Sequence, residues 1–338
     1  YTKKVRPASS LLELGTFVCM FPQLMSGPIT NFGEMQPQIQ KRRVDATMLE
    51  DGMQTFILGL GAKTLLANPM GGLWNNLGVI GYDSISTPYA WLGAFAYSFQ
   101  IYFDFSGYSM MAIGVGKMLG FQLPQNFNLP YMSGSAAEFW RRWHMTLGRW
   151  FKNYIYFPLG GSRKGSLKTI RNMLVVWAFT GLWHGASWNF VLWGLWFFLF
   201  LMLERWFLKP VLQKLPVASN LYLLLVVLLG WVIFRYSNVS LGWTLIKSLF
   251  GANGNALTSF STKIQLDSNR YLLLVSILAA TPAAHEFKGW LETRVQGNAL
   301  ASRVWDILFY SLLPVVLLLL STACLVGDSY NPFLYFQF

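Results

Sequence analysis

Charged residues are scarce in this chain, and so are cysteines and histidines. Only 12% of its 338 residues are charged and 54% are hydrophobic, whereas a soluble domain carries about 25% charged residues. That balance argues against a soluble domain and predicts a polytopic membrane protein. The two cysteines, Cys19 and Cys324, lie far apart in apolar surroundings. They offer neither a disulfide framework nor the spacing of a metal site.

Acidic residues are the scarcer of the two charge types. Against 26 Lys and Arg there are 14 Asp and Glu, which gives a net charge of +12. In a membrane protein such an excess collects in cytoplasmic loops, so it indicates orientation. The basic residues form short scattered clusters, including residues 41–43 and 163–171. We therefore expect no nucleic-acid partner.

A long uncharged run lies at the centre of the chain. Residues 172–203 contain no Asp, Glu, Lys or Arg, and His184 stands within them between Gly181 and Gly185. As one straight helix the run would be about 48 Å long, against roughly 30 Å of hydrocarbon. It must tilt, protrude or break, and the glycines favour a break near His184. An ionisable group at membrane depth is a candidate functional residue. The alternative is a glycine packing motif in which His184 only bonds a neighbouring carbonyl.

Other apolar runs predict further membrane spans. Residues 84–103, 215–234 and 307–327 are the strongest, and the total by run length is about five to eight. Residues 14–33 are uncharged but carry Pro22 and Pro28, which predicts a broken or re-entrant segment.

Asp104 directly follows the apolar run 84–103, and apolar residues resume after it. A carboxylate at this depth should face protein or water. We expect it to accept hydrogen bonds from backbone donors at a helix break, in preference to taking part in chemistry.

Residues 138–152 are predicted to form one amphipathic helix. Ser135 and Glu138 have the spacing of a capping box, which indicates a helix start. At 100° per residue the charged and the aromatic side chains separate onto two faces, with His144 at the edge of the apolar one. The simplest interpretation is an anchor at the membrane interface. A basic, glycine-rich loop follows at residues 160–165, which favours a cytoplasmic loop over a phosphate cradle.

Six stretches in this order resemble the membrane-bound O-acyltransferase family, in the branch that acetylates polysaccharides. They are FPQLMSGPI (21–29), YFDFSGYSMMAIG (102–114), PQNFNLPY (124–131), FWRRWHMTLGRWFKNYIYFPLGGSRKG (139–165), GLWHGASWNFVLWG (181–194) and the terminal NPFLYFQF. The histidine of WRRWH followed 40 residues later by that of LWHG makes the ordered set specific.

The resemblance implies an all-α polytopic membrane protein, a helical bundle with re-entrant and interfacial helices around a tunnel. Residues 1–338 would form a single membrane-bound O-acyltransferase domain that lacks the N-terminal transmembrane helices of full-length relatives. It also implies that His184 is catalytic and that His144 is a second functional histidine.

The expected reaction is transfer of an acetyl group from cytoplasmic acetyl-CoA toward hydroxyls of an extracytoplasmic polysaccharide. An alcohol needs a base, and histidine is suited to that role. We expect His184 to accept the proton, while His144 orients the acceptor or stabilises the oxyanion; the sequence leaves open which histidine is the base. Candidates for the donor phosphates are Arg141, Arg142, Arg163 and Lys164.

The resemblance further implies a multi-pass protein of the bacterial cytoplasmic membrane, with an SGNH/GDSL-like acetyltransferase partner outside. Acetyl-CoA is expected as co-substrate, with no bound cofactor and no metal. Three alternatives stay open: D-alanyl transfer to teichoic acid from a carrier protein, a proton-coupled transporter or flippase using His184 and Asp104, and a scaffold for an outer enzyme.

Overall fold

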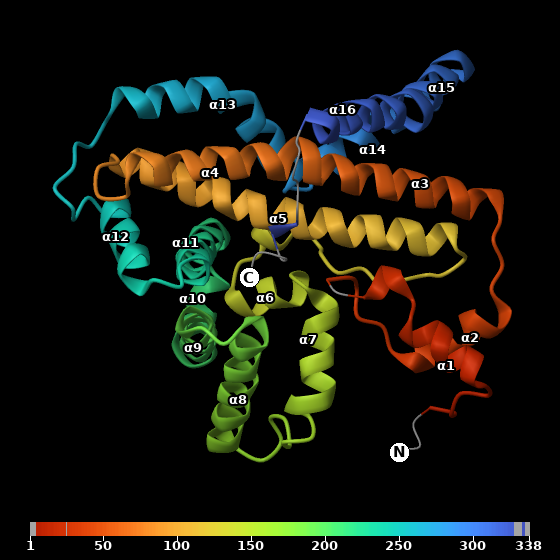
Figure 1. The fold of residues 1–338 in the computed structure, drawn as a ribbon, viewed down its shortest axis with the longest axis horizontal. Helices are drawn as coiled ribbons and strands as arrows, with labels where there is room; N and C mark the ends of the chain where they lie inside the picture. Colours follow the sequence, from red (N-terminus) through yellow and green to blue (C-terminus); the bar gives the residue numbers. More distant parts are fainter. Residues whose placement is uncertain (1–4, 25, 328–332, 335–338) are drawn as a thin grey trace.

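The computed structural model describes residues 5–24, 26–327 and 333–334. Within these residues every regular element is a helix, as the all-α prediction requires (Figure 1). The chain begins with two short helices, α1 (Leu11–Val18) and α2 (Phe32–Lys41). In the described residues between them the one regular element is a short 3-10 turn, Phe21–Gln23, so the segment 14–33 is broken, as predicted. The terminal tail motif lies outside the described residues, apart from Phe333 and Leu334.

A pair of long antiparallel helices spans the molecule (Figure 1). The first is α3 (Ala46–Gly61), which continues through a π-helical turn at Ala62–Ala67 into α4 (Asn68–Ile80). The second is α5 (Thr87–Met118), which packs along both. Its aromatic and small residues are largely buried, so α5 forms the central support of the fold.

Two reciprocal glycine pairs bring α3 and α5 into backbone contact. A Cβ atom on Gly59 would lie 2.5 Å from the carbonyl oxygen of Gly107, and one on Gly107 would lie 2.6 Å from that of Gly59. Gly52 and Gly114 oppose each other in the same way, at 2.8 and 2.6 Å. The pairs are seven residues apart on both helices, so they share one face. Small residues at such positions allow the close packing that holds membrane helices together.

The predicted helix break at Asp104 is wrong, because α5 runs through this residue without interruption. The carboxylate instead meets Lys63 of the π-helical turn, with Oδ1 2.5 Å from Nζ. Its other oxygen accepts a hydrogen bond of 2.8 Å from the backbone N–H of Leu334. Because an ammonium group and a distant backbone donor satisfy the carboxylate, the helix keeps its own hydrogen bonds. Leu334 is itself buried in the main core.

The central run is broken, as its length predicts. Helix α8 (Ser166–His184) ends at His184, and α9 (Trp188–Leu203) begins four residues later. Gly181 also serves close packing, since a Cβ there would lie 2.4 Å from the carbonyl oxygen of Phe190 in α9. Helices α8 and α9 thus form a hairpin, and both interpretations of the glycine motif hold in it. Gly181 allows close packing of the two helices, and the helix breaks at Gly185.

The remaining helices surround this hairpin and cover the long pair. They are α10 (Lys209–Leu212), α11 (Pro216–Arg235), α12 (Val239–Leu249), α13 (Phe260–Ala279), α14 (Ala283–Val295), α15 (Ala299–Asp306) and α16 (Leu313–Gly327). Helix α11 packs against α9 and α5, while α16 packs against α3. His285 lies exposed on α14.

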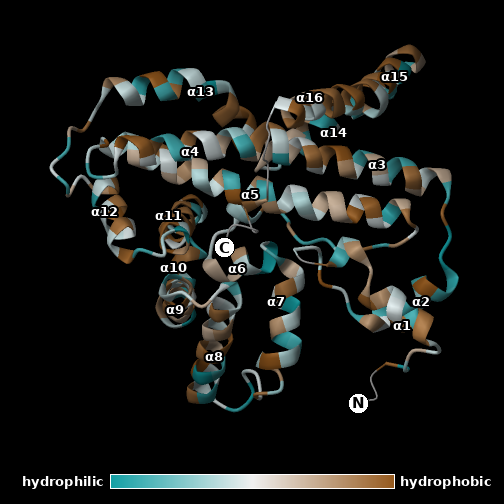
Figure 2. Ribbon diagram, in the orientation of Figure 1, coloured by the Kyte–Doolittle hydropathy of each residue, from teal (hydrophilic) through white to brown (hydrophobic). Residues whose placement is uncertain are grey.

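Among the described residues, three helical stretches are long and apolar enough to cross a membrane: Trp188–Leu212, Pro216–Arg235 and Ala299–Gly327. Their hydrophobic character is visible along α9 and α16 (Figure 2). The last two match the predicted spans 215–234 and 307–327, and the first matches the second half of the central run. The predicted span 84–103 overlaps the first half of α5, which begins at Thr87 and also carries Asp104 and Lys117. Helix α5 is not one of the three.

Substituting Gly107 by alanine should destabilise the fold. Its Cβ would press against the backbone of α3, and overpacking of this kind costs about 1–3 kcal/mol. We expect a lower thermal midpoint for Gly107→Ala in detergent, measured as loss of monodisperse protein. Gly72→Ala is the matched control, because nothing lies within 4 Å of its new Cβ. Equal midpoints for the two variants would contradict close packing at Gly107.

Replacing Asp104 by a neutral residue should destabilise the fold, because the ammonium of Lys63 then stays buried without the carboxylate that balances its charge. Breaking a buried pair costs about 3–5 kcal/mol, whereas replacing both partners restores much of that loss. We expect a large fall in thermal midpoint for Asp104→Asn and partial recovery for Asp104→Asn combined with Lys63→Met. The control is Glu292→Gln, which breaks a half-exposed pair with Lys288 that is worth about 0–1 kcal/mol.

Candidate active site

His144 lies at a break between two short helices. The predicted continuous helix 138–152 is wrong: α6 (Ala136–Arg142) ends, and α7 (Met145–Phe151) begins three residues later. The start of α6 is as predicted, because Ser135 Oγ accepts the backbone N–H of Glu138 at 3.1 Å. His144 has φ of 45°, a conformation that residues other than glycine rarely adopt. The break turns its side chain into the protein, where it is 5% exposed.

A preceding loop bridges the break. The N–H of Asn128 donates to the carbonyl of Arg142 at 2.9 Å, and the N–H of Met145 donates to the carbonyl of Asn126 at 2.9 Å. These bonds satisfy backbone groups that the interrupted helix releases. The side chain of Asn126 then reaches His144, with Oδ1 3.0 Å from Nδ1. The sequence marks Asn126 only as a loop residue, and no spacing rule connects it with His144.

Aromatic side chains enclose both histidines. The His144 ring stands edge-to-face on Phe105 at 4.7 Å between centroids. His184, at the end of α8, meets Trp193 and Phe234, each at 5.0 Å and nearly perpendicular. The Trp183 ring lies near both imidazoles, with centroids 6.1 Å from that of His144 and 4.9 Å from that of His184. Burial, and secondarily the nearby His184, lowers the pKa of His144, so its imidazole is neutral at pH 7.

The two histidines come together at one enclosed void of about 20 Å³, which both side chains line. A space of this size holds about one water molecule or one hydroxyl group. Apart from Thr180, its other lining residues are apolar or aromatic. His144 and His184, 40 positions apart in the sequence, therefore line the same small void inside an apolar core.

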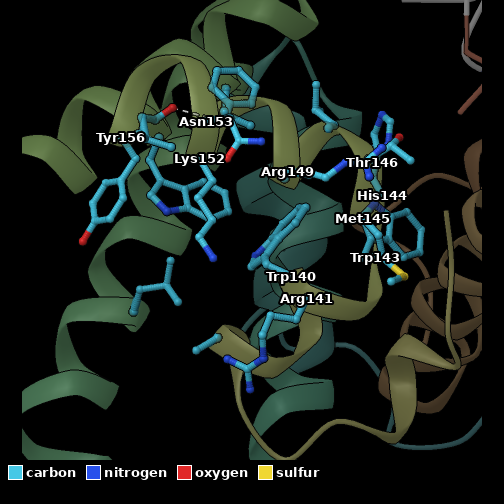
Figure 3. Close-up of a pocket in the computed structure, with 18 of the residues that line it drawn as sticks. Trp140, Arg141, Trp143, His144, Met145, Thr146, Arg149, Lys152, Asn153 and Tyr156 are labelled. Carbon is cyan, nitrogen blue, oxygen red and sulfur yellow. Dashed lines mark hydrogen bonds between the residues drawn. The ribbon is translucent and has the colours of Figure 1, made fainter. Parts of the chain in front are cut away.

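A much larger cavity, of about 870 Å³, leads to His144 (Figure 3). Its walls come from α6, α7, the π-helical turn Lys152–Tyr156 and one face of α8. This volume is within the range of about 300–1,000 Å³ that holds small-molecule ligands. His144 lines both the large cavity and the small void, so it stands where the two meet.

Of the four basic residues predicted to bind the donor, the structure places Arg141 on the cavity wall. Arg142 is not on that wall and pairs with Glu138 at 2.7 Å. Arg163 and Lys164 are exposed in the loop after the π-helical turn and also lie off the wall.

Two further cations, Arg149 and Lys152, line the cavity. The sequence places them on the charged face of a helix but does not predict this role. Arg149 is held at 2.9 Å by Glu34 of α2, and the Lys152 ammonium lies over the Phe157 ring. Arg141 and Lys152 are therefore the cations best placed for an anionic ligand in the cavity.

Glu204 fixes the orientation of α6, and hence of Arg141. Its carboxylate accepts the N–H groups of Ala136 at 2.5 Å and Ala137 at 3.0 Å, both in the first turn of the helix. A buried carboxylate is well suited to a helix N-terminus, where unpaired N–H groups and the helix dipole favour negative charge. The sequence indicates only that Glu204 ends an apolar run.

In the described part of the chain every regular element is a helix, and a deep cavity reaches His144, which shares a small void with His184. Titratable side chains buried at the end of a cavity are typical of an enzyme site. The sequence model of the MBOAT family, the membrane-bound O-acyltransferases, matches residues 3–245. The chain belongs to this family, and it is an O-acyltransferase.

The relatives place the chain in the branch that modifies polysaccharides. It is 34% identical over 353 residues to the probable alginate O-acetylase of Azotobacter vinelandii, covering 97% of this chain and 70% of that protein. It is 36% identical over 292 residues to the peptidoglycan O-acetyltransferase of Helicobacter pylori, covering 81% and 54%. With the teichoic acid D-alanyltransferase of Bacillus subtilis it shares 30% over 193 residues, covering 53% and 48%. The predicted family and enzyme class are confirmed. Membership of an O-acyltransferase family excludes the transporter and scaffold alternatives.

Proposed function

We propose that this protein moves an acetyl group from cytoplasmic acetyl-CoA toward hydroxyls of a polysaccharide outside the bacterial cytoplasmic membrane. The observation that carries the proposal is the large cavity that ends at His144, next to the void shared with His184. Relatives named as alginate and peptidoglycan O-acetyltransferases support the acetyl group and the polymer. The proposal that an SGNH/GDSL-like acetyltransferase outside completes the transfer rests on the family resemblance.

The cavity suits an extended thioester. Its walls are mostly apolar and aromatic, which fits the uncharged arm of the donor, while Arg141 and Lys152 provide positive charge for the phosphates. Guanidinium and ammonium groups pair well with phosphate oxygens. In this arrangement the thioester carbon lies near His144 and the nucleotide end lies toward the cations.

The histidines provide the proton chemistry. An acceptor hydroxyl attacks the thioester carbonyl as an imidazole takes its proton; a C–O bond forms and the C–S bond breaks. The departing thiolate then receives the proton from the imidazolium, which restores the neutral base. The void of about 20 Å³ has room for the attacking oxygen beside both rings.

Replacing either histidine should abolish most transfer. General-base assistance is worth about 10²–10⁴-fold, so we expect losses of that size for His184→Ala and His144→Ala. The measurement is transfer of radiolabel from acetyl-CoA in membranes with matched expression. His285→Ala is the control, because that residue is exposed on α14. If both variants act like the parent, the proposed mechanism is wrong. If the parent transfers only from a carrier-bound D-alanyl donor, acetyl-CoA is the wrong donor.

Removing the positive charge of Arg141 should weaken donor binding. We expect Arg141→Gln to raise the KM for acetyl-CoA about tenfold or more with a small change in kcat, since lost binding in the ground state appears mainly in KM. The double variant Arg163→Gln/Lys164→Gln removes two exposed charges away from the cavity and should leave KM unchanged. If the double variant raises KM and Arg141→Gln does not, the donor phosphates bind at the loop that carries Arg163 and Lys164.

A further inference from the structure

We propose that Asn126 is a positioning residue that holds neutral His144 as the Nδ1–H tautomer, so that the Nε2 lone pair faces the reacting groups. The catalytic consequence rests on the proposed acyl transfer, whereas the tautomer itself does not. The inference comes from hydrogen bonds that converge on one oxygen atom, Asn126 Oδ1.

The orientation of the Asn126 amide follows from a neighbour that can only donate. The backbone N–H of Thr146 lies 3.3 Å from Asn126 Oδ1, so the amide atom on that side accepts and must be the oxygen. The amide nitrogen then faces the other way, 3.0 Å from Ser109 Oγ on α5. A hydroxyl accepts as readily as it donates, so this second contact agrees with the same orientation.

The threonine hydroxyl adds a second donor to the same oxygen. Thr146 Oγ accepts the backbone N–H of Ile29 at 3.1 Å. Its own hydrogen is thereby left for Asn126 Oδ1, which lies 2.9 Å away. Hydrogen bonds that run in one direction polarise one another in a buried site. The N-terminal segment at Ile29 thus contributes, through Thr146, to holding the amide in place.

The same oxygen fixes the proton on the histidine. His144 Nδ1 lies 3.0 Å from Asn126 Oδ1, and a carbonyl oxygen only accepts, so Nδ1 must carry the hydrogen. A neutral imidazole has one N–H, and Nε2 is therefore the acceptor nitrogen. The exposed fractions of Asn126, Thr146 and His144 are 1%, 3% and 5%. Bulk water therefore does not compete for these groups.

This tautomer decides what His144 does in the reaction. A lone pair at Nε2 accepts the proton of the attacking hydroxyl, whereas a neutral ring of this kind has no N–H there to offer an oxyanion. Once protonated, the ring keeps its Nδ1–H bond to Asn126, so the same contact stabilises the imidazolium. The Nδ1–H tautomer therefore suits His144 to act as a base in the proposed transfer, at the void that it shares with His184.

The first test measures the tautomer itself in the complete protein, without relying on activity. The chain has three histidines, so ¹⁵N labelling of histidine gives a small set of signals, which His144→Gln and His285→Gln assign. We expect the His144 spectrum to show a protonated Nδ1 and a bare Nε2 at pH 7. A protonated Nε2 with a bare Nδ1 would overturn the proposal, even if the protein transfers acetyl groups normally. The expected tautomer in a protein that transfers no acyl group would instead refute the proposed function.

The second test asks whether the tautomer matters for turnover. Asn126→Leu removes the acceptor, and a base presented as the wrong tautomer loses about 10²–10⁴-fold. We expect that loss in kcat, with an unchanged KM for the donor and a changed His144 spectrum. Asn126→Asp keeps an acceptor oxygen and should retain the Nδ1–H signature together with most of the kcat that Asn126→Leu loses. Asn128→Leu, an exposed position in the same loop, should behave like the parent. If Asn126→Leu is folded and keeps the parent kcat, the positioning role is excluded.

Discussion

The break between α6 and α7 is the feature on which the site depends. Trp143 and His144 both enter the core there, where the Trp143 ring packs 5.0 Å from Trp231 and the His144 ring packs on Phe105. In a continuous helix these neighbours would point about 100° apart, which would leave His144 at the edge of the apolar face. The left-handed backbone at His144 has a conformational cost. Burial of two aromatic rings and the backbone bonds from the preceding loop offset it.

The break is held from several distant parts of the chain. Glu204 at the end of α9 caps α6, Asn126 in the loop after α5 bonds His144, and Ile29 near the N-terminus bonds Thr146. Each contact is short and buried or half-buried, which makes the arrangement sensitive to loss of any partner. The glycine-paired helices α3 and α5 provide the rigid support, because backbones in direct contact leave little room for adjustment. A site held in this way keeps its groups in position before the substrate arrives.

The buried pair Lys63–Asp104 belongs to the same support. It joins the π-helical turn to α5 and gives the backbone of Leu334 an acceptor. Ionisable residues at this depth invite a proton-relay interpretation, yet neither residue lines the histidine void or the large cavity. The pair therefore stabilises the packing of helices and lies apart from the proposed active site.

The sequence by itself determined the helical membrane class, the family and the broken central run, and it marked His184 and His144 as candidate functional residues. These follow from composition, from the length of an uncharged run and from ordered motifs, all of which are local properties of the chain. Only the tertiary structure decided the break at His144, the partner of Asp104, the hydrogen bonds of Asn126 and Glu204, and which of the four basic residues reaches the cavity. Helical periodicity assigns each residue a face, but it assumes an unbroken helix, and the break at Trp143 and His144 comes from contacts with the core and with the loop at Asn126. Hydrogen-bond partners far apart in sequence leave no spacing to detect, because only folding brings them within hydrogen-bond distance.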